Sequence, residues 1–312
     1  MKGSDKRLTR RQCTSMLATA LAASLGPRFC RAASDKPLRA AISADTLAGA
    51  NVNDARAAYR VWLDQVARQY IHQTAEPVPE IFLPSEEIIR DVRQGTVDCY
   101  GVTALELAKL LDLTDPNSLV LQDYLADGME YILLVHNSSQ FKNVADLKNA
   151  RIVSHLHRDM VLRPAWLSTM LAANNLPQPD SFFASQKLSD KVNQVVLPVF
   201  FHRVDAACLA RRDWETAVEL NPQLGRDLRL LAVSPKVIPI AFAFRRNTSA
   251  DARKALIDAI QGINKMTAGQ QIVELYQSRA FVQRPISVMK PTFEMVRQFE
   301  RLAGQPAGPR KG

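Results

Sequence analysis

Several features that mark other classes of protein are missing from this sequence. No apolar run approaches the ~20 residues that a membrane-spanning helix needs. The motifs GxSxG, HExxH, Walker A and GxGxxG are absent, and no CxxC or Cys/His spacing indicates a metal site. No run of Lys and Arg with interleaved aromatic residues suggests a nucleic-acid surface. We therefore expect no membrane span, no metal, no cofactor and no nucleic-acid partner, and an enzyme is disfavoured.

The first 32 residues differ from the rest of the chain. Basic residues precede an uncharged run over residues 14–26, and small residues surround Ala32. This order is typical of an export signal, and Thr9, Arg10 and Arg11 add a twin-arginine character. A disordered basic tail on a cytosolic protein is the alternative interpretation. We expect export by the twin-arginine or the general route, cleavage near Ala32 and a periplasmic location.

Cysteine is scarce, and the charge is concentrated at the N-terminus. Of four cysteines, Cys13 and Cys30 would leave with the signal, so Cys99 and Cys208 remain. These two either pair or stay as buried thiols, and their places in predicted buried strands favour thiols. Residues 1–32 carry seven Lys and Arg against one Asp, so only +3 of the net +9 belongs to the remaining chain.

Past the signal, short apolar runs alternate with helical patterns, which predicts an α/β protein with parallel sheets. Predicted strands cover residues 38–44, 80–83, 96–100, 130–136, 151–155, 204–209, 228–233 and 238–245. Predicted helices cover residues 53–73, 85–94, 103–111, 144–148, 161–174, 189–201, 250–267, 270–277 and 292–302.

Local signals mark some of the predicted helix ends. Ser85 and Ser189 are expected N-caps. Gly95 suits a left-handed residue just past a helix C-terminus. Thr103 and Glu106 have the spacing of a capping box.

The chain has two halves with a similar order of elements. In residues 94–99 and again in residues 202–207, a helix ends, the chain turns, and a Val-Asp pair begins a buried strand. We therefore predict two lobes, each a mostly parallel sheet flanked by helices, joined by the strands at 130–136 and 238–245. The expected boundaries are 1–32 for the signal, 34–129 with 246–303 for the first lobe, 130–245 for the second lobe with the connecting strands, and 304–312 for a loose tail.

Two segments carry a resemblance to a known family. Residues 88–98, which read IIRDVRQGTVD, and residues 143–148, which read NVADLK and precede the strand at 151–155, resemble periplasmic binding proteins of the phosphate/phosphite/phosphonate type. The resemblance extends over residues 38–300. It implies a two-lobed type II periplasmic binding protein fold that serves an ABC importer.

In open parallel sheets, ligands bind beyond the carboxyl ends of the strands, and this places the candidate residues. In the second lobe, Ser154, His157 and Arg158 follow one strand. The resemblance implies a hydroxyl-rich turn there, of which only Ser154 is present, so a phosphonate is one possibility among oxyanions. Arg158 offers a planar fork of donors, although pairing with Asp159 would also explain it.

Further candidates come from neighbouring strand ends. Lys187 ends a further predicted strand of the second lobe, and Arg211 follows the strand at 204–209. For one of Arg211 and Arg212, a solvated position such as a pair with Asp213 is the alternative. In the first lobe, Thr46, Tyr100 and Thr103 border the expected cleft. Thr103 is also explained as an N-cap alone.

These observations predict a small anionic ligand, phosphonate-like or another oxyanion, captured by closure of the two lobes. The expected partner is an ABC permease in the inner membrane, and the protein is expected to be a monomer. The alternative is a sensory protein that presents its bound form to the periplasmic domain of a sensor kinase. An enzyme on this scaffold, and a metal held by His155 and His157, are weaker alternatives.

Overall fold

The computed structural model describes residues 39–47, 52–66 and 81–304 of the chain. The predicted export signal, the end of the predicted helix at 53–73 and nearly all of the predicted tail lie outside these residues. Within them, none of the helices combines the length and the apolar character that crossing a bilayer requires.

The first sheet contains six strands in the order β11-β4-β10-β3-β1-β2. Strands β1, β2 and β3 are parallel, whereas β10 runs antiparallel to β3 and β4, and β11 runs antiparallel to β4. Their bounds are β1 Ala40–Ser43, β2 Phe82–Leu83, β3 Cys99–Thr103, β4 Leu119–Gln122, β10 Ile240–Phe244 and β11 Phe281–Arg284.

The second sheet contains five strands in the order β7-β6-β8-β5-β9. Strand β6 is parallel to β7 and β8, and β5 is antiparallel to both β8 and β9. The bounds are β5 Tyr131–His136, β6 Arg151–His155, β7 Ser185–Ser189, β8 Ala206–Ala210 and β9 Leu228–Val233. The α/β class with two sheets is confirmed. Both sheets are mixed: β1 to β4 share one direction against β10 and β11, and β6 to β9 share one direction against β5.

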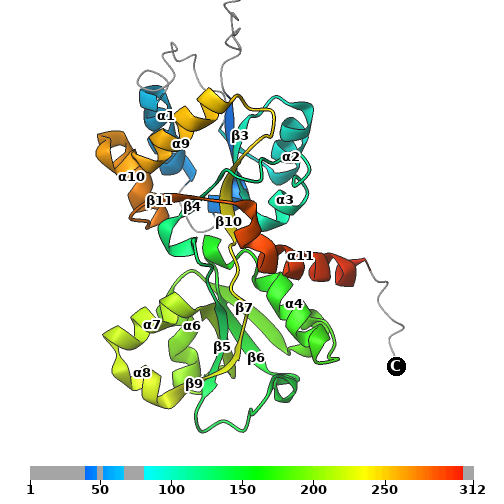
Figure 1. Ribbon diagram of the computed structural model, residues 1–312. Coiled ribbons are helices and arrows are strands. Elements are labelled where there is room, and N and C mark those ends of the chain that lie inside the picture. The colour runs from blue at the N-terminus through cyan, green and yellow to red at the C-terminus, as the bar shows by residue number, and fades with distance from the viewer. Residues whose placement is uncertain (1–38, 48–51, 67–80, 305–312) are drawn as a thin grey trace, which may run out of the picture. The chain divides into compact units, whose positions relative to one another are not determined.

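The helices cover both faces of each sheet (Figure 1). Their bounds are α1 Val52–Val66, α2 Ser85–Gln94, α3 Ala104–Ala108, α4 Arg163–Ala173, α5 Pro179–Phe182, α6 Val192–Phe200, α7 Arg211–Leu220, α8 Pro222–Asp227, α9 Ala250–Gln261, α10 Thr267–Tyr276 and α11 Lys290–Ala303. Alternation along β5 explains the layering: Leu133 packs into the core under α4, and Leu134 packs into the core under α6 to α8. A third cluster lies between the first sheet and α1, α9 and α10.

The chain crosses between the sheets twice at one place. Met129 and Val237 form an antiparallel bridge, in which each backbone N–H donates to the other residue's carbonyl at 2.8 Å. The predicted connections at 130–136 and 238–245 are therefore members of the sheets, β5 and β10, and the crossover is the short bridge next to their amino ends.

The amino-terminal edges of the two sheets repeat one local structure. Helix α2 ends at Gly95 with φ 79°, and α6 is followed by His202 with φ 56°. After each turn, an aspartate begins the strand and accepts a hydrogen bond from the backbone N–H at the start of the neighbouring parallel strand. Asp98 accepts from Arg39 at 3.3 Å, and Asp205 accepts from Arg151 at 2.7 Å. The sequence echo thus corresponds to a structural one.

Other local predictions had mixed outcomes. The Gly95 terminus and the Thr103–Glu106 capping box are confirmed. The two serine caps are wrong, since Pro84 and Lys191 occupy the cap positions of α2 and α6, and Ser189 ends β7. Strands β4 and β11 were not predicted. Cys99 and Cys208 are buried free thiols.

Candidate functional site

The carboxyl ends of the parallel strands of both sheets lie next to the crossover. In the first sheet these are the ends of β1, β3 and β4, beside the amino end of β10. In the second sheet they are the ends of β6, β7, β8 and β9, beside the amino end of β5. Because the Met129–Val237 bridge joins the amino ends of β5 and β10, it brings both edges to the same region. We refer to this region as the shared edge.

Arg158 lies at the shared edge and connects the two sheets. It follows β6 in the short turn Arg158–Met160, and it is only 3% exposed. Its guanidinium carbon lies 4.7 Å from the ring centroid of Tyr276, which belongs to α10 beside the first sheet. This cation–π contact between the halves is favourable because the site is desolvated.

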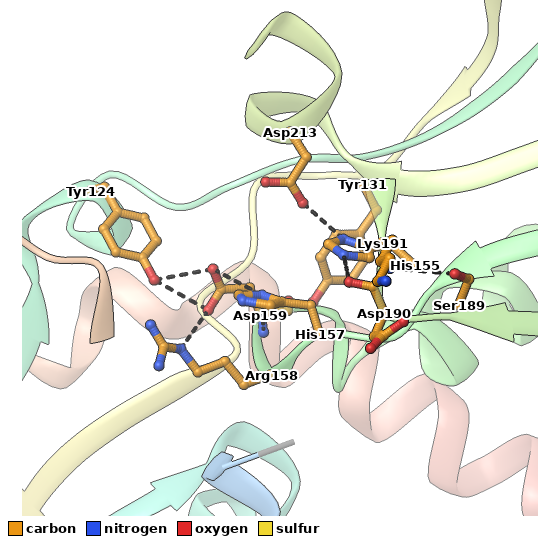
Figure 2. Close-up of polar contacts among 10 residues, drawn as sticks. All are labelled: Tyr124, Tyr131, His155, His157, Arg158, Asp159, Ser189, Asp190, Lys191 and Asp213. Atoms are coloured by element: carbon orange, nitrogen blue, oxygen red, sulfur yellow. Dashed lines mark hydrogen bonds and ion pairs between the residues drawn. The ribbon is translucent and has the colours of Figure 1, made fainter. Parts of the chain in front are cut away.

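Asp159 organises the side chains around Arg158 (Figure 2). Its carboxylate accepts hydrogen bonds from the Tyr124 hydroxyl at 3.0 and 3.2 Å and lies 3.7 Å from Arg158 Nε. The Asp159 backbone N–H donates to His157 Nδ1 at 3.3 Å, and its carbonyl accepts from the Tyr131 hydroxyl at 2.5 Å. Both the side chain and the backbone of Asp159 therefore fix the turn Arg158–Met160 in position.

A second polar contact lies at the end of β6. His155 is buried, and its Nδ1 lies 2.9 Å from Asp213 Oδ2, while its Nε2 lies 3.4 Å from the Asp190 carbonyl. The rings of His155 and His157 stack with their centroids 5.4 Å apart. The neighbouring Arg212 places its guanidinium 4.3 Å from the ring centroid of Tyr124. Two arginines, two histidines and the carboxylates of Asp159 and Asp213 therefore lie together on this side of the shared edge.

Burial sets the protonation of the neutral groups here. Burial lowers the pKa of His157, and the nearby Asp159 only partly opposes this shift. Burial raises the pKa of Tyr124, with Asp159 adding to the effect, and it raises the pKa of Tyr276. Near neutral pH, the two tyrosines are therefore hydrogen-bond donors and His157 favours its neutral form.

The first sheet contributes hydroxyl and aromatic groups to the shared edge. Thr46 donates to the Ser43 carbonyl at 2.7 Å and also hydrogen-bonds to Tyr276, whose hydroxyl accepts from Tyr59 at 2.7 Å. Close by, the buried Glu106 carboxylate of α3 accepts from the hydroxyl of Ser43 in β1 at 2.5 Å and from the backbone N–H of Thr103 in β3 at 2.7 Å.

The structure brings together only part of the predicted set. Thr46, His157 and Arg158 lie at the shared edge, with Thr103 at the end of β3. Ser154 is buried within β6 against Cys208, and Arg211 forms an ion pair with Glu130 beside the crossover.

Two predicted residues lie away from the others. Tyr100 is fully buried in the core, where its hydroxyl hydrogen-bonds to that of Thr114 at 2.6 Å. Lys187 is exposed on β7, which is the edge strand of the second sheet.

Sequence reasoning did not single out Tyr124, Asp159 and Tyr276, which the structure places around Arg158. A signal for Tyr124 was present: residues 119–121 are a short apolar run followed by the polar residues Gln122 and Asp123, which is typical of a short buried strand and its end. Tyr124 therefore follows a strand end. Tyr276 carries no such signal, because it comes from a helix far along the chain. In the described residues, no group of three His, Cys, Asp or Glu side chains is arranged to hold a metal ion.

Comparisons with known proteins address the family directly. The sequence matches, over residues 51–284, the family described as ABC transporter, phosphonate, periplasmic substrate-binding protein. The chain belongs to this family. As a member, this substrate-binding protein is the periplasmic component of an ABC transporter and works with a permease. No curated protein sequence matches the chain.

Solved structures share the fold of this substrate-binding protein. One is a binding protein component of an ABC phosphonate transporter from Pseudomonas aeruginosa (TM-score 0.54, 16% identity, 86% of this chain and 88% of that one). Another is PhnD1 from Prochlorococcus marinus in complex with methylphosphonate (0.54, 16%, 85% and 98%). A third is a Xanthomonas citri protein bound to ATP (0.60, 13%, 86% and 98%). At these identities the likeness establishes the type II periplasmic binding fold.

Proposed function

We propose that this substrate-binding protein captures a small oxyanion at the shared edge, with Arg158 as its principal cationic contact, and delivers it to the permease. The observation that carries the proposal is the position of Arg158: a buried guanidinium at a strand end of one sheet, in contact with Tyr276 beside the other. A guanidinium matches the geometry of phosphonate, sulfonate and carboxylate groups through two parallel hydrogen bonds.

The charges around Arg158 support an anion. Arg212 lies on the same side and adds positive charge, and the imidazole of His157 can take up a proton. The Thr46 and Thr103 hydroxyls donate to the Ser43 carbonyl and the Glu106 carboxylate, so donation from them to an anion would replace those bonds. Asp159 holds Arg158 and Tyr124 in place and offsets part of the positive charge. A singly or doubly charged head group is therefore expected, and a polyanion is not.

Capture involves movement of the lobes, residues 34–129 with 246–303 against residues 130–245. A ligand that contacts groups from both sheets stabilises the closed arrangement by its differential contacts. In this proposal, the closed form docks on the permease. The N-terminal signal directs export to the periplasm and is removed by cleavage near Ala32, and N-terminal sequencing of the exported form tests that step.

A thermal-shift screen tests the proposal on the purified mature protein. Methylphosphonate, phosphite, methanesulfonate and acetate are the first probes. A ligand at ~100 times its dissociation constant adds about 2.7 kcal/mol and raises the melting temperature by several degrees. Arg158→Met should abolish the shift, Arg158→Lys should keep part of it, and the exposed Arg226→Met on α8 should keep all of it.

Because Arg158 is buried, Arg158→Met is also measured for folding by circular dichroism. A shift that survives unchanged in a folded Arg158→Met protein would overturn the role of Arg158. Failure of every anion to shift the wild-type protein would overturn anion capture itself.

A further inference from the structure

Gln122 is a buried polar residue whose side chain has no hydrogen-bond partner within the described part of the chain. It is the last residue of β4, it is 2% exposed, and neither its amide nitrogen nor its amide oxygen is paired. An amide buried without partners destabilises the folded protein, so such groups are rare and call for an explanation. Gln122 takes part in none of the hydrogen-bonded clusters described above.

The strand register places the Gln122 side chain beside the shared edge. Gln122 pairs with Phe281 of β11, and antiparallel partners point to the same face of a sheet. The Phe281 ring packs against Tyr276, with centroids 6.2 Å apart, and Tyr276 is the ring on which the Arg158 guanidinium lies. Two residues after Gln122, Tyr124 donates to Asp159. Phe281 and Tyr276 thus connect the strand position of the unpaired amide to the buried guanidinium.

We propose that Gln122 is a specificity-determining residue that hydrogen-bonds to a neutral polar group of the ligand, next to the anionic head held by Arg158. This inference rests on the proposed function and adds the class of ligand to it. A carboxamide presents one acceptor and two donor hydrogens. A simple oxyanion would accept from the nitrogen and leave the oxygen unpaired, and an alkyl group would leave both unpaired.

A hydroxyl group or a carboxamide on the ligand satisfies both atoms of Gln122, because each can accept from Nε2 and donate to Oε1. The ligand is accordingly an oxyanion that also carries a hydroxyl or carboxamide group. Sites built to hydrogen-bond a ligand group discriminate strongly against analogues that lack it, since the protein groups are then left buried and unpaired.

Matched pairs of probes test this inference by titration calorimetry. The pairs are methylphosphonate with hydroxymethylphosphonate, methanesulfonate with hydroxymethanesulfonate, and acetate with glycolate. In at least one pair, the wild-type protein should bind the hydroxylated member about tenfold or more tightly. Gln122→Met, which keeps the size of the side chain, should reduce that ratio to about twofold or less, whereas affinity for the unsubstituted member should stay within about threefold.

The matched control is Gln283→Met on the adjacent strand β11, where the glutamine is exposed and donates to the Asn117 carbonyl at 3.0 Å. It should leave the ratio unchanged. Gln122→Met should also raise the melting temperature of the ligand-free protein by about 2–4 °C, because a buried unpaired amide is removed.

Failure of this inference and failure of the proposed function give different results. Equal binding of both members of every pair by the wild-type protein, or an unchanged ratio in Gln122→Met, would overturn the role of Gln122 and leave anion capture intact. If no probe binds the wild-type protein, anion capture fails and the role of Gln122 fails with it.

Discussion

The two sheets are built alike at their amino-terminal edges and differently at their carboxyl-terminal edges. At the amino edges, Gly95 and His202 turn the chain out of a helix, and Asp98 and Asp205 hold the neighbouring strand. At the carboxyl edges, one sheet presents hydroxyl and amide groups, and the other presents Arg158 among histidines and carboxylates. The similar amino edges stabilise the two sheets, and the differing carboxyl edges contain the candidate ligand-binding groups.

This division predicts separate consequences for substitutions at the two kinds of edge. Changes at the amino edges should alter the free energy of unfolding and leave ligand affinity unchanged, since they lie at the far ends of the strands. Changes at the carboxyl edges should alter ligand affinity and leave the free energy of unfolding nearly unchanged. The four predictions below test this separation, from the largest expected effect to the smallest.

Asp205→Ala should destabilise the protein more than Asp98→Ala. Asp205 accepts from the Arg151 backbone at 2.7 Å and pairs with its guanidinium at 3.0 Å, whereas the Asp98 contact is a single 3.3 Å bond. The expected losses in urea unfolding are about 1–2 kcal/mol and below about 1 kcal/mol, reduced by the partial exposure of the pair.

The Asp205 contribution also depends on pH. Arg151 lowers the pKa of Asp205 from its ordinary value of 3.8. Stability from this carboxylate is therefore present above that value and is lost as the pH falls through the lower, folded pKa. Equal losses in the two variants at pH 7 would contradict the predicted difference in strength between the two amino edges, and a loss of ligand affinity in either would contradict the separation of stability from binding.

Gly95→Ala and His202→Gly should change the free energy of unfolding in opposite directions. Both positions have positive φ, which costs a residue with a Cβ atom roughly 1–2 kcal/mol, and a Cβ at Gly95 would also meet the Arg245 guanidinium at 2.8 Å. Gly95→Ala should lower the free energy of unfolding by about 1–2 kcal/mol, and His202→Gly should raise it by up to about 1 kcal/mol. Destabilisation by His202→Gly would mean that its ring contact with His136 matters more than its backbone strain.

Anion affinity should increase as the pH falls from 8 to 5.5. Burial lowers the pKa of His157 below its ordinary value of 6.5, so the imidazole is neutral in the ligand-free protein at pH 7; Asp159, Arg158, Asp213 and His155 are the charged or titratable groups around it. A bound anion favours the protonated ring, so binding takes up a proton and strengthens several-fold at low pH.

Methanesulfonate is the suitable probe for this pH series, because its own charge is constant over the range. His157→Gln should flatten the dependence. A separate melting series without ligand should show stability from His157 present above pH 6.5 and lost as the pH falls through the lower, folded pKa. An identical slope in the variant would assign the dependence to another group.

Lys187→Ala and Tyr100→Phe should change affinity by less than about twofold, within the range of surface substitutions. Lys187 is exposed on an edge strand, and the Tyr100 hydroxyl is bonded to Thr114 inside the core. Calorimetry with the tightest oxyanion probe measures both. A larger loss in Lys187→Ala would extend the site along β7.

The predictability of the elements followed the range of the interactions that define them. Strands β6 and β9 and the ends marked by Gly95 and Thr103 depend on neighbouring residues, and the sequence pattern located them. Strand β11 is only four residues long and depends on pairing with β4, which lies more than 150 residues away. Antiparallel β5 and β10 were found as strands, but their direction depends on the sheet that receives them.

The site followed the same rule. The position of Arg158, His157 and Thr46 at the shared edge was predictable because each lies within three residues of the end of β1 or β6. Tyr276, Tyr124 and Asp159 acquire their roles only from contacts across the molecule. Tyr100 shows the opposite error: its position near a strand end suggested the cleft, whereas alternation along β3 turns its side chain into the core.

By itself, the sequence determined the α/β alternation, the two similar halves and the polar residues at the strand ends, because these depend on periodicity and on short-range capping. Only the tertiary structure decided which of those residues meet. Sheet order and the crossover at Met129 and Val237 bring segments far apart in the chain into contact. Through these contacts the Arg158 guanidinium lies on the Tyr276 ring, and the Gln122 amide is buried without a partner in the described residues.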